Sequence, residues 1–153
     1  MPSRQPKKTP QTPSASAGVS VRNLTRVRPP QFPYEKAAQA LLPGWDISLV
    51  FVTPAAAQQL NKKLRKKTYE PNVLAYAAGA NSGEVIICPA VAKKQAPAYG
   101  IPPAKFAGFL FIHALLHLKG MRHGTTMEKA EREWFSRIAS LRIPNETTRR
   151  NWH

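Results

Sequence analysis

The sequence predicts an α+β fold: a single four-stranded mixed sheet covered by helices, one of which is buried. Short alternating or β-branched apolar runs, typical of strands, recur along the first 90 residues, and stretches with helical periodicity separate them. Residues 106–118 are apolar almost all the way round a helix, which is typical of a helix inside the core. At 153 residues the chain has room for one domain with tails, and it can form a core without disulfides.

The first 18 residues are rich in Pro, Ser, Thr and Lys and have no large apolar anchor. We predict that this basic tail is disordered, because it cannot bury enough surface to offset the entropy of ordering. A transit peptide is one interpretation of the tail, which the absence of acids before Glu35 suits but the four prolines by residue 13 do not.

The elements of the first half follow from apolar alternation and from Pro and Gly signals. Pro43-Gly44 closes the first helix, and Pro54 suits the first turn of the second. Gly79 and Gly83 bound the turn between the last two strands. We predict strands at residues 19–24, 46–52, 72–78 and 84–88, and helices at residues 34–42 and 55–66.

Three helices are predicted in the second half. A short one follows Pro89 to about residue 96, and Pro102-Pro103 begin the buried helix. The last, at residues 126–141, is amphipathic and has Thr126 as its N-cap. Its inward side chains are expected to be Trp134, Phe135, Ile138 and Leu141. The predicted domain spans residues 19–142, and residues 143–153 form a polar tail.

The cysteine count and the hydropathy of the chain limit which cellular compartments and partners are expected. One cysteine rules out an intrachain disulfide and a Cys-rich metal site, and Cys88 is expected to be a buried structural thiol because it closes an apolar run. No apolar run reaches the ~18 residues of a membrane span, and no secretory segment follows the start. We therefore expect a cytoplasmic protein without a membrane partner.

The charge is strongly positive. The chain has 23 Lys and Arg residues against 8 Asp and Glu residues, a formal net charge of +15. Such a surplus favours a polyanionic partner, with nucleic acid preferred over an anionic membrane. Asp46 is the single aspartate, which argues against a two-metal nuclease built on clustered carboxylates.

The most informative stretch holds three of the four histidines of the chain. His113 and His117 are four residues apart, so on a helix they lie on one face, roughly 6 Å apart. Gly120 is suited to end that helix, and the chain can then fold back to bring His123 to the same point. Three neutral imidazoles around an open position are a catalytic zinc site. The sequence therefore predicts one zinc ion per chain, bound by a buried helix.

The spacing also matches the metzincin pattern H-E-x-x-H-x-x-G-x-x-H, except at one position. Ala114 stands where a zinc protease has its glutamate general base. Alanine cannot accept a proton, so a metalloprotease mechanism is disfavoured.

Three ordered blocks of the sequence match known motifs. Residues 113–123, His-Ala-Leu-Leu-His-Leu-Lys-Gly-Met-Arg-His, resemble the signature H-G-x-L-H-L-x-G-x-D-H. Residues 60–76 are similar to L-N-x-x-Y-R-x-K-D-x-P-T-[ND]-V-L-S-F, and residues 83–88 to G-[DE]-I-x-I-C. With these blocks the chain resembles the YbeY family of zinc-dependent endoribonucleases. Ala114, Ala75 and Arg122 depart from the family's Gly, Ser and Asp.

The resemblance implies a single-strand-specific endoribonuclease that acts in maturation and quality control of 16S-type ribosomal RNA, with ribosomal small-subunit components as possible partners. It also implies that Arg65 falls on the family's functional arginine, so we take Arg65 and His113 as the catalytic candidates. A guanidinium can grip a phosphate and stabilise the charge that builds on its oxygens. Glu84, at the family's acidic strand position, is either an acceptor for a ligand histidine or a structural residue.

Basic side chains near these residues are the candidate RNA contacts, and the basic tail of residues 1–18 is expected to touch RNA in preference to acting as a transit peptide. A solvated helix end is the alternative for most of them, since cations also complement the helix dipole. Arg122 has donors only, so it weakens metal binding if it faces the ion and contacts phosphate if it faces outward. The predicted nucleic-acid-binding residues are Lys62, Lys63, Arg65, Lys66, Lys67 and Arg122.

Two other functions stay open at this point. One is a non-catalytic RNA- or ribosome-binding assembly factor in which the metal is structural or lost. The other is a metal hydrolase that acts on something other than RNA. For the nuclease, the attacking group is either hydroxide from the metal or the ribose 2′-OH.

Overall fold

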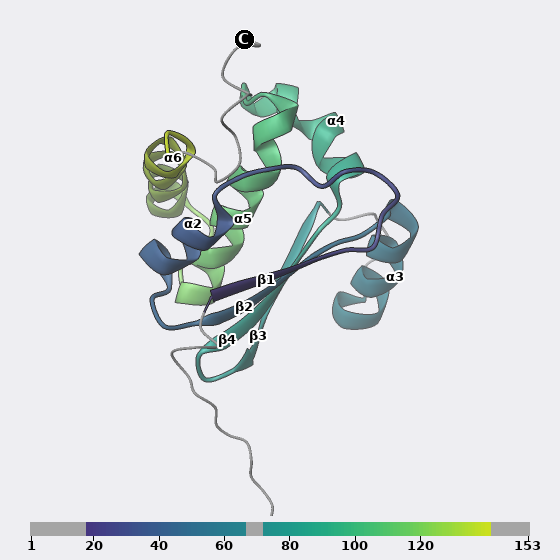
Figure 1. Cartoon of the computed structure of the whole chain (residues 1–153), viewed down its shortest axis with the longest axis horizontal. Coiled ribbons are helices and arrows are strands. Elements are labelled where there is room, and N and C mark those ends of the chain that lie inside the picture. Colours follow the sequence, from purple (N-terminus) through teal and green to yellow (C-terminus); the bar gives the residue numbers. More distant parts are fainter. Residues whose placement is uncertain (1–17, 67–71, 142–153) are drawn as a thin grey trace, which may run out of the picture.

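The computed structural model describes residues 18–66 and 72–141, and it confirms the predicted α+β fold with one four-stranded mixed sheet (Figure 1). The predicted 1–18 and 143–153 tails lie outside these ranges, apart from Gly18. The elements in chain order are β1 (Gly18–Asn23), α2 (Tyr34–Leu41), β2 (Asp46–Phe51), α3 (Pro54–Arg65), β3 (Val73–Gly79), β4 (Ser82–Ile87), α4 (Pro89–Tyr99), α5 (Pro103–Lys119) and α6 (Thr125–Ala139).

The strand order in the sheet is β1-β2-β4-β3. β1, β2 and β4 run parallel, and β3 is antiparallel to β4. A tight turn at residues 80–81 joins β3 to β4, so this hairpin needs only a local connection. β3 is therefore an edge strand, and its outer side is free to border a site.

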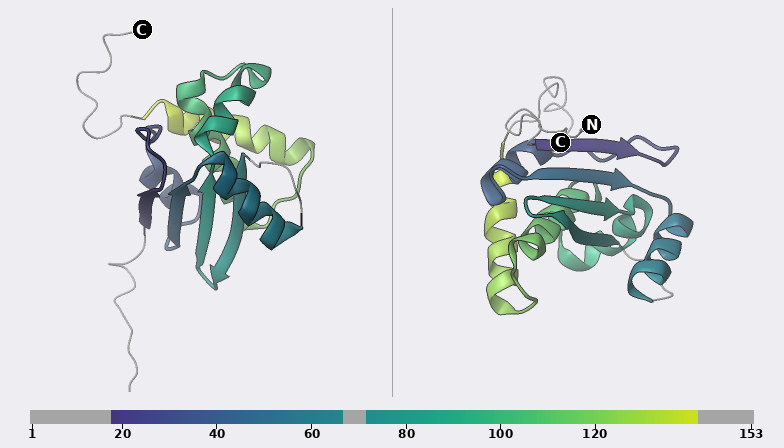
Figure 2. Two further views of the ribbon diagram at one scale, coloured as in Figure 1. Left: turned by 90° about the vertical axis from the view of Figure 1, so that its right-hand side faces the viewer. Right: turned by 90° about the horizontal axis from the view of Figure 1, so that it is seen from below.

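Helices cover both faces of the sheet (Figure 2). Side chains alternate along β2, so Ile47, Leu49 and Phe51 join the main core with α2 and α5. Val50 faces the opposite side, where it joins a smaller core beneath α3. The main core lies between the sheet and α5.

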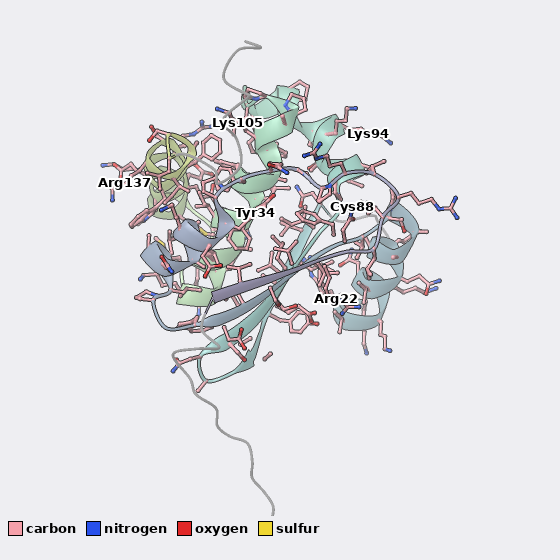
Figure 3. All side chains as sticks on the ribbon, viewed as in Figure 1. Arg22, Tyr34, Cys88, Lys94, Lys105 and Arg137 are labelled. Atoms are coloured by element: carbon pink, nitrogen blue, oxygen red, sulfur yellow. The ribbon has the colours of Figure 1, made fainter. Side chains whose placement is uncertain are left out.

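Apolar side chains fill the space between the layers, and most charged side chains lie on the surface. Tyr34 and Cys88 lie inside the molecule, whereas Lys94, Lys105 and Arg137 are on its surface (Figure 3). Cys88 is 1% exposed, which confirms the predicted buried thiol.

Helix α5 is the central helix of the fold and packs against α2, α4, α6 and the strands β3 and β4. Its residues from Phe106 to Ile112 are all buried, as its apolar sequence predicts. Gly108 is required for this packing, because a Cβ atom there would lie 2.2 Å from Cδ1 of Phe32. Phe32 in turn stacks on Phe135 of α6.

No single helix in the described ranges has both the length and the apolar composition of a membrane span; α4 and α5 reach them only as a pair bent by 97°.

Two details of the last helix differ from the prediction. Thr126 is not the N-cap, because α6 begins at Thr125 and Gly124 precedes it. Gly124 has φ 149° and ψ −176°, a backbone conformation open to glycine and not to threonine. Leu141 does not face inward: it follows the end of the helix and is 39% exposed. In addition, α4 continues past Ala96 and ends at Tyr99, where Gly100 is the C-cap with φ 69°.

Candidate metal centre

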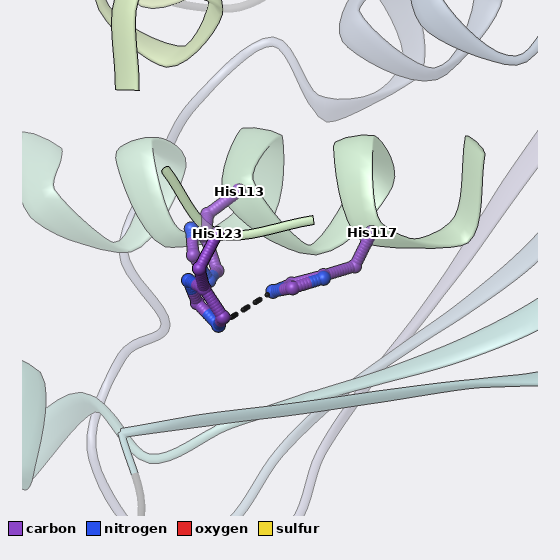
Figure 4. A group of neighbouring side chains, drawn as sticks. All are labelled: His113, His117 and His123. Carbon is purple, nitrogen blue, oxygen red and sulfur yellow. Dashed lines mark hydrogen bonds between the residues drawn. The ribbon is translucent and has the colours of Figure 1, made fainter. Parts of the chain in front are cut away.

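Local backbone geometry brings the three histidines together, as the sequence predicted (Figure 4). His113 and His117 lie one turn apart on α5. At Gly120 the backbone adopts φ 110°, and its N–H donates to the carbonyl of His117 at 2.9 Å. The N–H of Met121 donates to the carbonyl of Leu116. Together these two hydrogen bonds end the helix and reverse the direction of the chain. This reversal places His123 against the two helical histidines.

The three imidazoles have the spacing of ligands to one ion. One nitrogen from each ring lies within 4.8 Å of the other two. Nε2 of His117 and Nε2 of His123 are 3.1 Å apart. Two nitrogens bound to a tetrahedral zinc at ~2.0–2.1 Å are about 3.3 Å apart. The donor set and its geometry therefore fit a three-histidine zinc site with an open fourth position.

Glu131 holds the first ligand in place. Its Oε2 contacts Nδ1 of His113, and this carboxylate is only 7% exposed. A carboxylate acceptor on one ring nitrogen fixes the tautomer and raises the basicity of the other nitrogen. Nε2 of His113 is thereby left as the nitrogen that can bind an ion.

The protonation state of His117 favours metal binding. Burial lowers the pKa of His117 below its ordinary value, and the neighbouring His113 and His123 lower it further. A hydrogen bond to the backbone of Met121 opposes this shift. The ring therefore stays neutral at neutral pH, which a ligand imidazole must be.

The histidines line a cleft of about 820 Å³. The edge strand β3 borders it, with α5 and the 120–124 turn on one side and the end of α3 on the other. The lining residues are Leu64, Arg65, Asn72, Val73, Leu74, Ala75, Tyr76, Ala77, His113, Ala114, His117, Leu118 and His123. The cleft thus combines a candidate metal site, the cationic side chain of Arg65 and part of the edge strand β3.

A family model described as Endoribonuclease YbeY matches residues 21–139. The chain belongs to the YbeY family.

Curated relatives share this family. Endoribonuclease YbeY of Bacillus licheniformis is 30% identical over 119 residues, which cover 68% of this chain and 74% of the relative. Endoribonuclease YbeY of Neisseria meningitidis serogroup A is 35% identical over 104 residues, covering 59% and 61%. That of Bdellovibrio bacteriovorus is 32% identical over 87 residues, covering 56% and 58%. The chain spans about three fifths of the length of the latter two relatives.

A solved structure has the same fold. The solution structure of TM1509 from Thermotoga maritima superposes with a TM-score of 0.58 at 15% identity, covering 78% of this chain and 88% of that chain. At this identity the likeness concerns the fold alone.

The basic residues predicted to bind RNA divide into two groups. Arg65 lines the cleft with the three histidines, at the last position of α3. The helix ends there because Lys66 adopts the left-handed conformation, with φ 58°. Residues that are exposed but do not line the cleft are Lys62, Lys63, Lys66 and Arg122, and Lys67 lies outside the described residues.

Of the two roles left open for Glu84, acceptor for a ligand histidine or structural residue, its contacts support the structural one. Glu84 does not contact a ligand histidine; it accepts the hydroxyl of Tyr76 instead. The acceptor is Glu131, which sequence analysis missed. The available signal was its position on the inward face of α6, one turn after the buried Met127, where a carboxylate needs a partner.

Proposed function

We propose that this chain is a metal-dependent endoribonuclease, which hydrolyses phosphodiester bonds of single-stranded RNA with one zinc ion held by His113, His117 and His123. The observation that carries the proposal is the convergence of three imidazoles and the Arg65 guanidinium on one cleft. This combination suits phosphoryl chemistry, because it offers three neutral ligands beside a permanent cation.

RNA as the substrate class is supported by charge and by family. The formal net charge of +15 favours a polyanion, and the curated relatives carry the name Endoribonuclease. Exposed Lys62 and Lys63 on α3, and Lys66 directly after it, would add phosphate contacts next to the cleft. From the family resemblance we further propose ribosomal RNA maturation as the setting, small-subunit components as partners, and the cytoplasm as the location.

Each residue of the site has a distinct task. The three histidines would hold the ion, and Glu131 orients His113. Bound zinc would supply Lewis acidity, which polarises a phosphoryl oxygen and lowers the pKa of water. Arg65 would stabilise the extra negative charge on the phosphoryl oxygens. Ala114 lines the cleft but offers no proton acceptor.

The test is cleavage of a labelled single-stranded RNA by purified protein, with and without chelator. Zinc-loaded wild type should cut the single strand faster than a duplex of the same sequence, and chelator should abolish cleavage. His117→Ala should be inactive while remaining folded, since His117 is only half-buried. The matched control is His153→Ala, which removes the one histidine outside the predicted ligand set.

Two outcomes would overturn the proposal. RNA binding without turnover, unchanged in His117→Ala, would favour a non-catalytic RNA- or ribosome-binding assembly factor. Hydrolysis of a peptide or small ester but not of RNA would favour a different metal hydrolase.

A further inference from the structure

The cleft contains one aromatic side chain that the metal chemistry does not use. Tyr76 lies on β3 and is 39% exposed. It is the only tyrosine, phenylalanine or tryptophan among the described residues that line the cleft. A large ring left open to solvent in the same cleft as a candidate metal site can bind a ligand that has an apolar face.

The ring is held in place from the neighbouring strand. Tyr76 and Glu84 are directly opposite in the β3–β4 register, and the Tyr76 hydroxyl donates to Oε1 of Glu84. This bond, with lesser contributions from burial and the Glu84 charge, raises the pKa of Tyr76 to about 12. The phenol therefore stays protonated at neutral pH and is not a general base. Its available function is its ring face, fixed in orientation by Glu84.

The strand that carries Tyr76 also presents main-chain groups to the outer edge of the sheet. The N–H of Cys88 donates to the carbonyl of Asn72, so residues 72, 74 and 76 are the ones that bond to β4. The main-chain groups of Ala75 therefore point to the outer edge, and Ala77 follows where the register becomes irregular between Ala77 and Gly79. Both residues line the cleft and have only a methyl side chain. An extended chain that carries ribose hydroxyls and phosphates can run along this edge.

We propose that the Tyr76 ring is the stacking platform for an unpaired RNA base next to the scissile phosphate, and so selects single strands. The inference rests on the proposed function, since the metal and Arg65 fix where that phosphate lies. Proteins that bind single strands commonly stack bases on aromatic side chains beside a cationic groove. Here the groove has Arg65 on the α3 side and the histidines on the α5 side. In a duplex the same base is already stacked and paired, so it cannot reach the ring.

The experiment measures RNA affinity separately from cleavage. Chelator-treated protein is titrated into a fluorescein-labelled single-stranded RNA nonamer, and binding is followed by anisotropy. A second series uses nonamers in which one position at a time has a ribose without a base. Tyr76→Ala should weaken binding of the intact nonamer about tenfold, as expected for one lost stacking contact. Tyr76→Phe keeps the ring and should bind within about twofold of wild type.

The decisive comparison is between the affinity lost when one base is removed from the RNA and the affinity lost in Tyr76→Ala. At one position, removing the base should weaken wild type by about the same factor as Tyr76→Ala, and Tyr76→Ala should lose nothing more on that abasic RNA. Tyr99→Ala is the matched control, because Tyr99 is 45% exposed but does not line the cleft. Tyr76→Leu, which fills similar space without a π face, should behave like Tyr76→Ala.

The outcomes separate this inference from the proposed function. Equal affinity of wild type and folded Tyr76→Ala would overturn the stacking inference, as would full additivity of the two losses. Wild type that binds RNA with the predicted Tyr76 dependence but never cleaves it would overturn the nuclease and leave the stacking platform standing. Wild type that cleaves RNA but binds it no more tightly than Tyr76→Ala would support the nuclease and overturn the stacking platform.

Discussion

Glu131 on α6 contacts Nδ1 of His113 on α5, and this pair ties the last helix of the fold to the candidate metal centre. Arg122 stands where the family has an aspartate, and it is exposed and outside the cleft. The acceptor beside His113 is Glu131, and Arg122 has donors only.

We expect Glu131→Ala to weaken zinc binding about 10- to 100-fold, because a ligand histidine that loses its outer acceptor becomes less basic and less well oriented. Glu131→Gln keeps an acceptor oxygen and should fall between Ala and wild type. Competition against a chromophoric chelator measures these affinities. Glu128→Ala, an exposed position on the same helix, is the control. Equal affinity of Glu131→Ala and wild type would show that Glu131 has no role in the site.

This relationship also shows where sequence reasoning reached its limit. The convergence of His113, His117 and His123 is local, because helical spacing and the Gly120 turn determine it, and it was predicted. The partner of His113 depends on how α6 packs against α5, and no local pattern contains that information. Likewise, the Tyr76–Glu84 contact depends on the register of two strands. The elements could be predicted from periodicity, but their pairing could not.

The order of the strands in the sheet is a second feature that could not be predicted from the sequence. The two strands around the turn at residues 80–81 were predicted, but not that β4 inserts between β2 and β3. This order leaves β3 at the edge and brings its outer side to the cleft. It arises from tertiary packing against α5, which the sequence pattern of either strand does not encode.

Arg65 is expected to act on turnover more than on binding. Arg65→Ala should lower kcat by about 100-fold or more, because it removes a donor aimed at charge that develops in the transition state. Arg65→Lys should recover only part of this rate, since an ammonium cannot form two parallel hydrogen bonds to phosphate. Steady-state cleavage of single-stranded RNA measures both. Arg26→Ala, an exposed arginine outside the cleft, is the control; a rate for Arg65→Ala equal to this control would refute the role.

The lowered pKa of His117 predicts how the metal-free protein responds to acid. In the unfolded chain this histidine titrates near 6.5, so below that pH the unfolded state binds more protons than the folded state. The free energy of unfolding should therefore be constant with respect to this group above pH 6.5 and should fall as the pH drops below it. Urea unfolding in chelator at several pH values measures the fall. His117→Gln should show less of it; an identical profile would exclude His117 as its source.

Gly108 should be intolerant of a larger side chain, because Phe32 occupies the space beside it. Gly108→Val is expected to lower the free energy of unfolding by about 1–3 kcal/mol or more through overpacking. Ala104→Val, at an exposed position of the same helix, should cost about 0.5 kcal/mol. Urea unfolding at fixed pH compares the two. Equal stabilities would mean that Phe32 can move aside.

X-ray absorption of the zinc-loaded protein tests the central claim most directly. The account predicts one zinc per chain with three imidazoles at ~2.0–2.1 Å, and a decrease to two imidazoles in His123→Ala. Sulfur in the coordination shell, or a zinc environment unchanged by His123→Ala, would contradict it.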